Sequence, residues 1–287
     1  LALAAGFQAA LVGTGRADNA VCLRGGSTSE LTSAVSRAAA RVIEADPGVA
    51  RLPGGEALAV PELVVLVNLP RRGDPAASSN VTVRGLDARA LALRPEVRLV
   101  AGRMFREGAD EVIAGRPLGR RFAHCALGEQ VRLGNRQWRV VGQFEAGGSG
   151  FESEIWGDRE SLLPVFDRLN FQSVTLRLAD PERLPELEAR LEADPRLNVE
   201  VQRESEYYAA QSAQLAGVIR VLGFFLVAVM AAGAVFGALN TMYASIGART
   251  REIAMLLALG FTPGQVRLSF VIEAVLLCLL GGVLGCL

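Results

Sequence analysis

Residues 245–270, SIGARTREIAMLLALGFTPGQVRLSF, separate two long apolar runs. Residues 221–248 carry no charged side chain. As a helix they would rise about 42 Å, which exceeds a hydrocarbon core of about 30 Å. Residues 268–287 are again apolar, with Glu273 as their one charge. The sequence therefore predicts two membrane spans, at about 218–244 and 264–287, joined by a short segment.

The joining segment, residues 249–260, is predicted to be a helix of its own. It begins with Arg249, Arg251 and Glu252, continues with apolar residues, and reaches Gly260 where a helix C-terminal glycine belongs. Such a segment is too apolar for a solvated loop. We therefore expect it to dock against another surface.

A second helix start follows at residues 262–265. Thr262 suits an N-cap, Pro263 the first turn, and Gln265 the closing position of a capping box. Arg267 adds to the arginines of the preceding segment. By the positive-inside rule this connection is predicted to be cytoplasmic.

Residues 248–261, ARTREIAMLLALGF, followed by the apolar run around Glu273, resemble the cytoplasmic loop and next membrane helix of FtsX/MacB-type ABC transporter permeases. The resemblance implies that residues 249–260 form the coupling helix against a partner ATPase. The residues assigned to coupling are Arg249, Arg251, Glu252, Ile253, Leu256, Leu257 and Gly260. An interfacial helix lying on the bilayer is the alternative reading, with the charges as its solvated face.

Composition limits the chemistry of the chain. Its 287 residues have a net charge of zero, which gives no electrostatic argument for nucleic acid. All 30 basic residues are arginine, so no Walker A lysine is present. We expect no cofactor on this chain and no enzymatic activity of its own. ATP and magnesium would be held by a separate ABC ATPase partner.

The predicted fold class is an α+β extracytoplasmic domain joined to transmembrane α-helices. Residues 1–15 are predicted to be the end of a first membrane helix, 16–206 the external domain, and 207–287 a stalk followed by the permease helices. The family has four membrane helices, so we interpret the sequence as a truncated part of a longer permease. Phrases at 83–87, 101–105, 110–115 and 127–131 follow the order of the MacB-like periplasmic core domain.

Within the external domain, hydrophobic patterning predicts strands and helices. Residues 63–69 indicate a strand buried on both faces, and residues 80–85 a half-buried one. Gly134-Asn135 suits a tight hairpin turn. The remaining predicted strands are 20–24, 131–133, 137–144, 173–178 and 198–201, and the predicted helices are 27–46, 160–169 and 185–194.

Several residues are of types that could bind a metal or act as a nucleophile, but we predict structural roles for them. His124 has no second metal ligand at suitable spacing, and Ser149 lies in a Gly-rich loop that only approaches the G-x-S-x-G pattern. Cys22 and Cys125 are expected to be buried thiols, with a disulfide as the less favoured alternative. An acidic group is read as a solvated loop, with pairing to arginines or to a cationic ligand left open: Glu152, Glu154 and Asp158.

Two features concern the membrane helices. A carboxylate within an apolar run is costly, so Glu273 is predicted to make a structural or coupling contact. Small residues at G-x-x-x-G spacing allow helices to approach closely, within the chain as the plainer choice or across a dimer. These are Gly233, Gly237, Gly281 and Gly285.

The resemblance implies the membrane subunit of an ABC transporter in the bacterial inner membrane, with several passes and its large domain outside the cytoplasm. It implies a homodimer or a pair with a related permease, within the lipid bilayer. A periplasmic or outer-membrane partner is compatible with it. The substrate class would be a lipoprotein, peptide or amphiphile. The alternative is an FtsX-like regulator that controls an external partner without transport.

Overall fold

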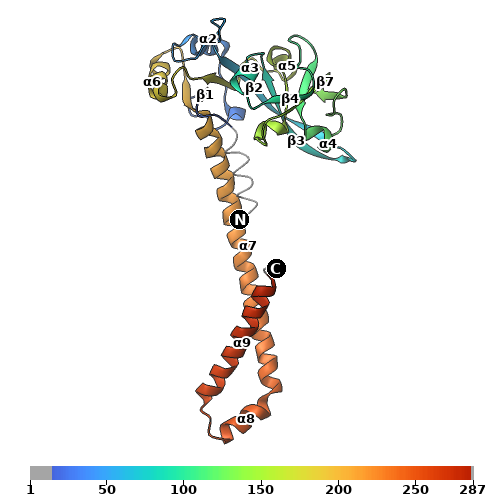
Figure 1. Cartoon of the computed structure of the whole chain (residues 1–287), viewed down its shortest axis with the longest axis vertical. Coiled ribbons are helices and arrows are strands. Elements are labelled where there is room, and N and C mark those ends of the chain that lie inside the picture. The colour runs from blue at the N-terminus through green and yellow to red at the C-terminus, as the bar shows by residue number, and fades with distance from the viewer. Residues whose placement is uncertain (1–14, 286–287) are drawn as a thin grey trace. The chain divides into compact units, whose positions relative to one another are not determined.

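The computed structural model describes residues 15–285, so the membrane-helix end predicted at 1–15 falls outside it except for its last residue. The chain divides into two compact units, with the division between Val218 and Ile219. The first unit holds the sheet, and the second holds apolar helices (Figure 1). The predicted class of α+β domain joined to long apolar helices is confirmed.

A mixed sheet organises the first unit. The strand order in the described residues is β10-β1-β9-β2-β3-β8-β5-β7-β4, with β6 paired to β7. The pairs β3–β8 and β5–β7 are parallel, and the others are antiparallel. The strands are β1 Asn19–Arg24, β2 Ala59–Arg71, β3 Asp74–Leu86, β4 Arg98–Gly102, β5 Glu111–Gly115, β6 Gln130–Leu133, β7 Arg136–Glu145, β8 Glu154–Asp158, β9 Ser173–Arg177 and β10 Val199–Arg203.

Helices cover both faces of this sheet and create two apolar cores. One core contains buried residues of α2 Arg37–Ala45, α4 Leu118–Arg121, α5 Arg159–Val165 and α6 Leu184–Ala193. The other contains residues of α3 Ala90–Leu93, of the 3-10 turn η2 Gly150–Ser153 and of the start of α7. Two further 3-10 turns are η1 Glu30–Thr32 and η3 Pro181–Arg183. Near β1, α2 and α6 lie at one end of the sheet (Figure 1).

Strand β2 is longer than predicted and changes its neighbours along its length. Its first residues, 59–62, pair with β9, and residues 63–71 pair with β3. The expectation of burial on both faces holds as far as Val65 but fails beyond it, because Leu66 is 49% exposed and Asn68 is exposed. Among the residues that the structure describes, one edge of this half of β2 has no neighbouring strand.

The helix predicted at 27–46 is wrong in its first half. Residues 30–32 form only η1, whose cap is Ser29, and Val35 is held extended by a reciprocal backbone pair with Phe171. The helix starts one residue after Ser36, whose Oγ accepts from the Ala39 N–H. Two serine caps in succession thus divide what looked like one helical pattern.

The helix predicted at 160–169 is also shorter, since α5 ends at Val165. Asp167 has a φ of 52°, a left-handed conformation that stops a helix. The strands at 173–178 and 198–201 and the helix at 185–194 are confirmed within two residues at each end. The prediction that the 80–85 strand is half-buried is wrong at Arg84, which is only 2% exposed.

The predicted β6–β7 hairpin is confirmed, with Leu133 opposite Arg136. Gly134 has a φ of 58° and Asn135 keeps a negative φ, the pattern of a type II′ turn. A Cβ at Gly134 would lie 2.6 Å from Val165 Cγ1. The turn therefore needs glycine for its conformation and also for its close approach to α5.

Helix α7, Glu204–Ala248, begins in the first unit and ends in the second. The stalk predicted from residue 207 lies on this continuous helix, and its first residues, Tyr207 and Tyr208, are buried in a core of the first unit. The second unit continues with α8 Thr250–Ala258 and α9 Pro263–Gly285. Within residues 15–285, two segments are long and apolar enough to cross a membrane, Gly217–Ala248 and Pro263–Val283.

Candidate functional site

The joining helix α8 has well-defined ends. At its C-terminus Gly260 has a φ of 96°. The Phe261 N–H donates to the Leu256 carbonyl at 3.2 Å, and the Gly260 N–H donates to the Leu257 carbonyl at 3.1 Å. This is the Schellman arrangement, which satisfies carbonyls that a helix end otherwise leaves open. The predicted C-terminal role of Gly260 is confirmed.

The start of α9 is closed by side chains. The Thr262 N–H donates to Gln265 Oε1 at 2.9 Å, and the Gln265 N–H donates back to the Thr262 carbonyl at 3.0 Å. The Thr262 hydroxyl lies 3.0 Å from the same Gln265 oxygen, and Pro263 occupies the first turn. One half of the predicted capping box is present, the bond from the Thr262 N–H to the Gln265 side chain, while the Thr262 hydroxyl donates to that side chain and does not accept from the Gln265 N–H. Because α8 has a fixed end and α9 a fixed beginning, the connection between them has little freedom.

The exposed side of α8 combines apolar and charged groups. Met255 is 63% exposed and Leu259 is 73% exposed, although both are apolar. Arg251 and Glu252 are exposed and make no hydrogen bond or ion pair within residues 15–285. Ile253, by contrast, is half-buried. The helix therefore presents free charges and uncovered apolar surface together, as a docking element would.

Glu273 has a partner within the second unit. Its Oε2 lies 3.3 Å from Arg249 Nη1, across 24 residues of sequence. This ion pair joins the residue before α8 to the middle of α9. It agrees with the predicted structural contact for Glu273. An exposed pair of this kind contributes about 0–1 kcal/mol in water and more where water is excluded.

The glycine motifs do not pack against other parts of the described chain. A Cβ at Gly233, Gly237, Gly281 or Gly285 would have no atom within 4 Å, so close packing within the chain at these positions is not found. The faces of α7 and α9 that carry them are uncovered. A cleft of about 850 Å³, lined by residues of both helices from Ala238 to Val283, separates the helices instead. The alternative of packing across a dimer stays a prediction.

A group of buried charges in the first unit was not predicted from the sequence. We call it the charge cluster: Arg84 and Arg94 with Glu30, Glu62, Glu154 and Glu204, all at most 7% exposed. Arg84 pairs with Glu30 at 2.9 Å and Glu154 at 2.8 Å. The cluster brings together residues from η1, β2, β3, β8, the end of α3 and the start of α7.

Glu62 and Arg94 join the two halves of the cluster. Glu62 lies 2.5 Å from Arg84 Nη1 and 2.8 Å from Arg94 Nη1, although the Arg94 contact is an ion pair without hydrogen-bond geometry. Arg94 Nη2 then donates to Glu204 Oε1 at 3.2 Å. The Phe151 ring also lies 4.7 Å from the Arg94 guanidinium carbon. Glu204 is the first residue of α7, so the cluster fixes the beginning of that helix to the sheet.

Burial and charge act differently on two carboxylates of the cluster. Burial raises the pKa of Glu62, but Arg94 and Arg84 outweigh it, and its pKa is lowered overall. Burial also raises the pKa of Glu204, and Arg94 with the Asn19 amide offsets this only in part, so its pKa stays raised. Glu62 is therefore held as a carboxylate, whereas the ionised form of Glu204 is less favoured.

The acidic residues predicted as a solvated loop are instead structural. Glu154 is buried against Arg84 and accepts from the Trp156 Nε1–H at 2.7 Å. Asp158 is buried and caps α5 through the Glu160 and Ser161 N–H groups. Glu152 accepts from the Ala146 and Gly148 N–H groups. Pairing with backbone donors and one arginine engages all three carboxylates, of which Glu154 and Asp158 are buried and Glu152 is half-buried.

The other candidate residues stand apart. Cys22 and Cys125 are buried free thiols, as preferred from the sequence. Ser149 is buried, with no partner for its hydroxyl in the described part of the chain. His124 has a φ of 65° and lines a surface cleft. Among residues 15–285, no group of three His, Cys, Asp or Glu residues could hold a metal ion.

Comparison with known families gives two matches. The MacB-like periplasmic core domain family matches residues 1–194, and the FtsX-like permease C-terminal family matches residues 224–287. This chain belongs to the FtsX/MacB type of ABC transporter permease. The first match contains every strand of the sheet except β10 and most of the charge cluster, and the second contains α8, Glu273 and the glycine motifs.

Individual relatives agree with this membership. The macrolide export ATP-binding/permease protein MacB 1 of Aeromonas hydrophila is 26% identical over 96% of this chain and 48% of its own length. The MacB protein of Escherichia coli K12 is 31% identical over 57% of this chain and 27% of its own length. The chain thus spans about half, or less, of the length of these relatives.

Among solved structures, the periplasmic region of MacB from Actinobacillus actinomycetemcomitans matches with a TM-score of 0.50. The match covers 72% of this chain and 94% of that one, at 14% identity. At this identity the likeness shows the fold of the first unit alone.

Proposed function

We propose that this chain is the membrane part of an ABC transporter, which transmits the ATP-driven movement of a cytoplasmic ATPase to an extracytoplasmic domain. The substrate would be a lipoprotein, peptide or amphiphile that is exported or extracted. The observation that carries the proposal is α8, an uncovered helix of mixed apolar and charged surface between two apolar helices of membrane-spanning length. Arg249 and Arg251 favour the cytoplasmic side for this helix.

Force on α8 needs a route into the helices, and its ends supply one. The Arg249–Glu273 ion pair ties the residue before α8 to the middle of α9, and at the C-terminal side of α8 the Thr262–Gln265 contacts fix the start of α9. On the other side only Arg249 separates α8 from the end of α7. A helix fixed at both ends transmits displacement, whereas a flexible loop would absorb it. This supports a coupling role for residues 249–260.

Helix α7 supports transmission to the first unit. It is continuous from Glu204 to Ala248, and Glu204 is bound in the charge cluster while Tyr207 and Tyr208 are packed in the core. A pull on this helix must break buried ion pairs before the helix can leave the sheet. Movement of α7 would therefore displace the sheet domain with it.

The ATPase itself is a further part of the proposal. No lysine is present in this sequence for a P-loop, so ATP with magnesium would bind elsewhere. The names of the matched relatives combine ATP-binding and permease parts in one protein. Two arrangements of the ATPase are therefore considered: a separate partner subunit, as predicted from the sequence, and an ATPase carried on the same polypeptide. Assembly as a dimer is likewise proposed, with the uncovered glycine faces as the candidate contact.

The test uses the full-length permease with its ABC ATPase in nanodiscs. Three substitutions in α8 are compared with the native protein: Arg251→Glu, Glu252→Arg and Leu256→Asp. We expect each to reduce coupled ATP hydrolysis at least tenfold. Two control substitutions at exposed residues of the first unit should leave it unchanged, Arg24→Glu and Leu169→Asp. Unchanged coupling in all three α8 variants would refute the coupling role and leave α8 as an interfacial helix.

The FtsX-like regulatory alternative predicts the same coupling but no movement of substrate. The match of the first unit to the MacB-like core domain supports the transporter reading over it. Reconstituted vesicles distinguish the two, because a transporter moves an amphiphilic substrate out of the bilayer when ATP is added. A regulator would hydrolyse ATP and leave the substrate in place.

A further inference from the structure

The second half of β2 has a free edge. Residues 59–62 pair with β9 on this side, and the Val64 N–H donates to the Gln172 side chain at 3.1 Å. Further along, the Pro70 carbonyl accepts from the Ala123 N–H at 3.0 Å. Between these contacts no strand lies beside β2 in the described part of the chain. The gap spans residues 65–69, about 16 Å of extended backbone.

The N–H and C=O groups of each residue in this gap point either toward β3 or away from it, and the neighbouring contacts show which. Because Val64 and Pro70 direct their N–H or C=O groups away from β3, the alternate residues Leu66 and Asn68 do the same. Within residues 15–285, no backbone or side-chain group bonds to the N–H or C=O of either one. Two donors and two acceptors thus point outward along an exposed strand edge, the arrangement that accepts an added strand.

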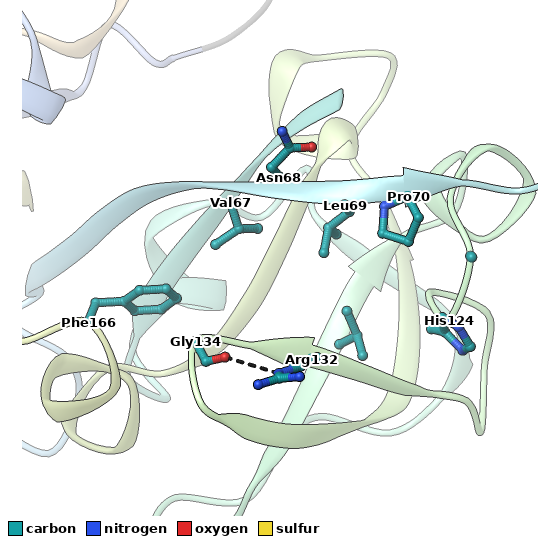
Figure 2. Close-up of a pocket in the computed structure, with 10 residues that line it drawn as sticks. Val67, Asn68, Leu69, Pro70, His124, Arg132, Gly134 and Phe166 are labelled. Carbon is teal, nitrogen blue, oxygen red and sulfur yellow. Dashed lines mark hydrogen bonds between the residues drawn. The ribbon is translucent and has the colours of Figure 1, made fainter. Parts of the chain in front are cut away.

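A cleft lies directly beneath this edge. It has a volume of about 510 Å³ and lies between β2 and the β6–β7 hairpin. Val67 and Leu69 point into it from β2, and Asn68 points to the opposite side (Figure 2). Phe166 and Val131 add apolar surface from the other walls. Alternate side chains of an added strand would enter this cleft, since they follow the same two-residue period.

The rim of the cleft is basic. Arg132 lines it. In the described residues its guanidinium makes one hydrogen bond, from Nε to the Gly134 carbonyl at 3.4 Å. Arg71 and Arg121 flank it at the Arg71–Phe122 bridge and form no ion pair within residues 15–285. The acids on these loops are already engaged. Asp74 lies opposite Arg71 in the hairpin register and Glu129 pairs with Arg72, which leaves Arg121 and Arg132 without an acidic partner in the described residues. Uncompensated positive charge around a strand edge favours a segment with acidic residues.

We infer that the 65–69 edge of β2 binds a short extended segment of a partner protein by strand addition, with an apolar side chain in the cleft and acidic residues against the arginine rim. Hydrogen bonds from the Leu66 and Asn68 backbone would hold the segment, and the cleft would select its alternate side chains. This surface belongs to the first unit and does not depend on the coupling role of α8.

The test uses the full-length protein in nanodiscs and a capped nonapeptide of alternating valine and threonine flanked by aspartates. Fluorescence anisotropy measures binding of the labelled peptide. We expect saturable binding, and protection of the Leu66 and Asn68 amides from hydrogen exchange. The same peptide with N-methyl groups on alternate amides should bind at least tenfold more weakly, because it lacks half of its donors. Lysine in place of aspartate should have a similar effect.

Protein variants locate the site. Asn68→Pro removes the outward N–H without removing a ladder bond to β3, so peptide binding should fall at least tenfold. Asn68→Ala keeps the N–H and should bind as the native protein does. Arg132→Glu should weaken the aspartate peptide and restore the lysine peptide. Circular dichroism confirms that each variant is folded.

Three results would overturn the inference. They are no saturable binding up to about 1 mM peptide, equal binding of the N-methylated peptide, or native affinity in a folded Asn68→Pro variant. A shift of that variant from dimer to monomer without peptide binding would assign the edge to a second copy of this chain instead. Intact ATPase coupling in Asn68→Pro is expected, which keeps this test separate from that of α8.

Discussion

Replacing Glu62 by glutamine is expected to destabilise the first unit strongly, whereas the same change at Glu204 is expected to destabilise it less. Glu62 is fully buried between Arg84 and Arg94. Without its charge both arginines lose a partner where water cannot replace it. Removing one member of a buried ion pair costs about 3–5 kcal/mol. At about 2–4 °C per kcal/mol for a domain of this size, the unfolding temperature should fall by about 6–20 °C.

Glu204→Gln changes a carboxylate whose ionised form is already disfavoured by burial. A glutamine oxygen can still accept from the Asn19 amide and the Arg16 N–H, now 2.8 and 3.0 Å away. Its NH2 group then replaces the oxygen that accepts from Arg94 Nη2, so Arg94 loses one acceptor but keeps Glu62 as a partner. We expect a loss of about 1–3 kcal/mol, or about 2–12 °C. Because both variants exchange glutamate for glutamine, their effects on the unfolded state are similar. The difference between their losses of stability therefore reports on the folded state.

Tryptophan fluorescence of the full chain measures the unfolding temperature of the first unit directly, because both tryptophans, Trp138 and Trp156, are buried in that unit. The lowered pKa of Glu62 means that its contribution is present above the ordinary carboxyl pKa of about 4.3 and lost as the pH falls through the lower, folded value. The difference in unfolding temperature between the native protein and Glu62→Gln should therefore become smaller at acid pH. A loss in Glu204→Gln equal to that in Glu62→Gln would refute the assignment of the two carboxylates.

Three further predictions follow from local geometry. Gly134→Ala should lower the unfolding temperature more than Gly73→Ala in a thermal scan: both positions have positive φ, but a Cβ meets Val165 only at Gly134. Similar losses would contradict the contact argument. Burial raises the pKa of Cys22 to about 12 and that of Cys125 to about 11, so maleimide should modify neither at pH 7 in the native protein, as judged by mass spectrometry. Rapid labelling would show that the core opens. Gly260→Val should speed hydrogen exchange at the Phe261 amide far more than Gly260→Asn, since asparagine tolerates a φ of 96° better. Equal rates would mean that α8 does not end as described.

Regions with strong local signals were predictable from the sequence. The α8–α9 connection is an example, because a glycine stop and a Thr-Pro-x-Gln start each act within one helical turn. The hairpin at Gly134 is another, since two flanking strands and a turn pair are contiguous. In these cases the interactions that fix the structure lie within a few residues of each other.

The charge cluster was not predictable in the same way. Glu62 and Arg84 belong to neighbouring strands, but Glu204 reaches Arg94 only after 110 residues of intervening chain. A single signal was available, because Glu62 interrupts the apolar run AVPELVVLV, where an unpaired carboxylate would be costly. It showed that a partner must exist, but not which of the 30 arginines supplied it.

The helix predicted at 27–46 failed for a related reason. Its apolar spacing fits a helix, but Val35 pairs with the backbone of Phe171, a contact across 136 residues that no local pattern encodes. The free edge of β2 was missed because the apolar run 63–69 looks the same whether one or two strands lie beside it. In both cases long-range backbone pairing, and not the local pattern of residues, determines the structure.

The position of β1 determines when the first unit can finish folding during synthesis. This strand is made before both of its neighbours, β9 and β10, at residues 173–177 and 199–203. Nearly the whole unit must therefore leave the ribosome before β1 has either partner. Until then its buried residues, from Asn19 to Leu23, lack the neighbouring strands that cover them. Contacts of such long sequence separation slow folding and prolong exposure to aggregation, so this permease is expected to depend on chaperones during its biogenesis.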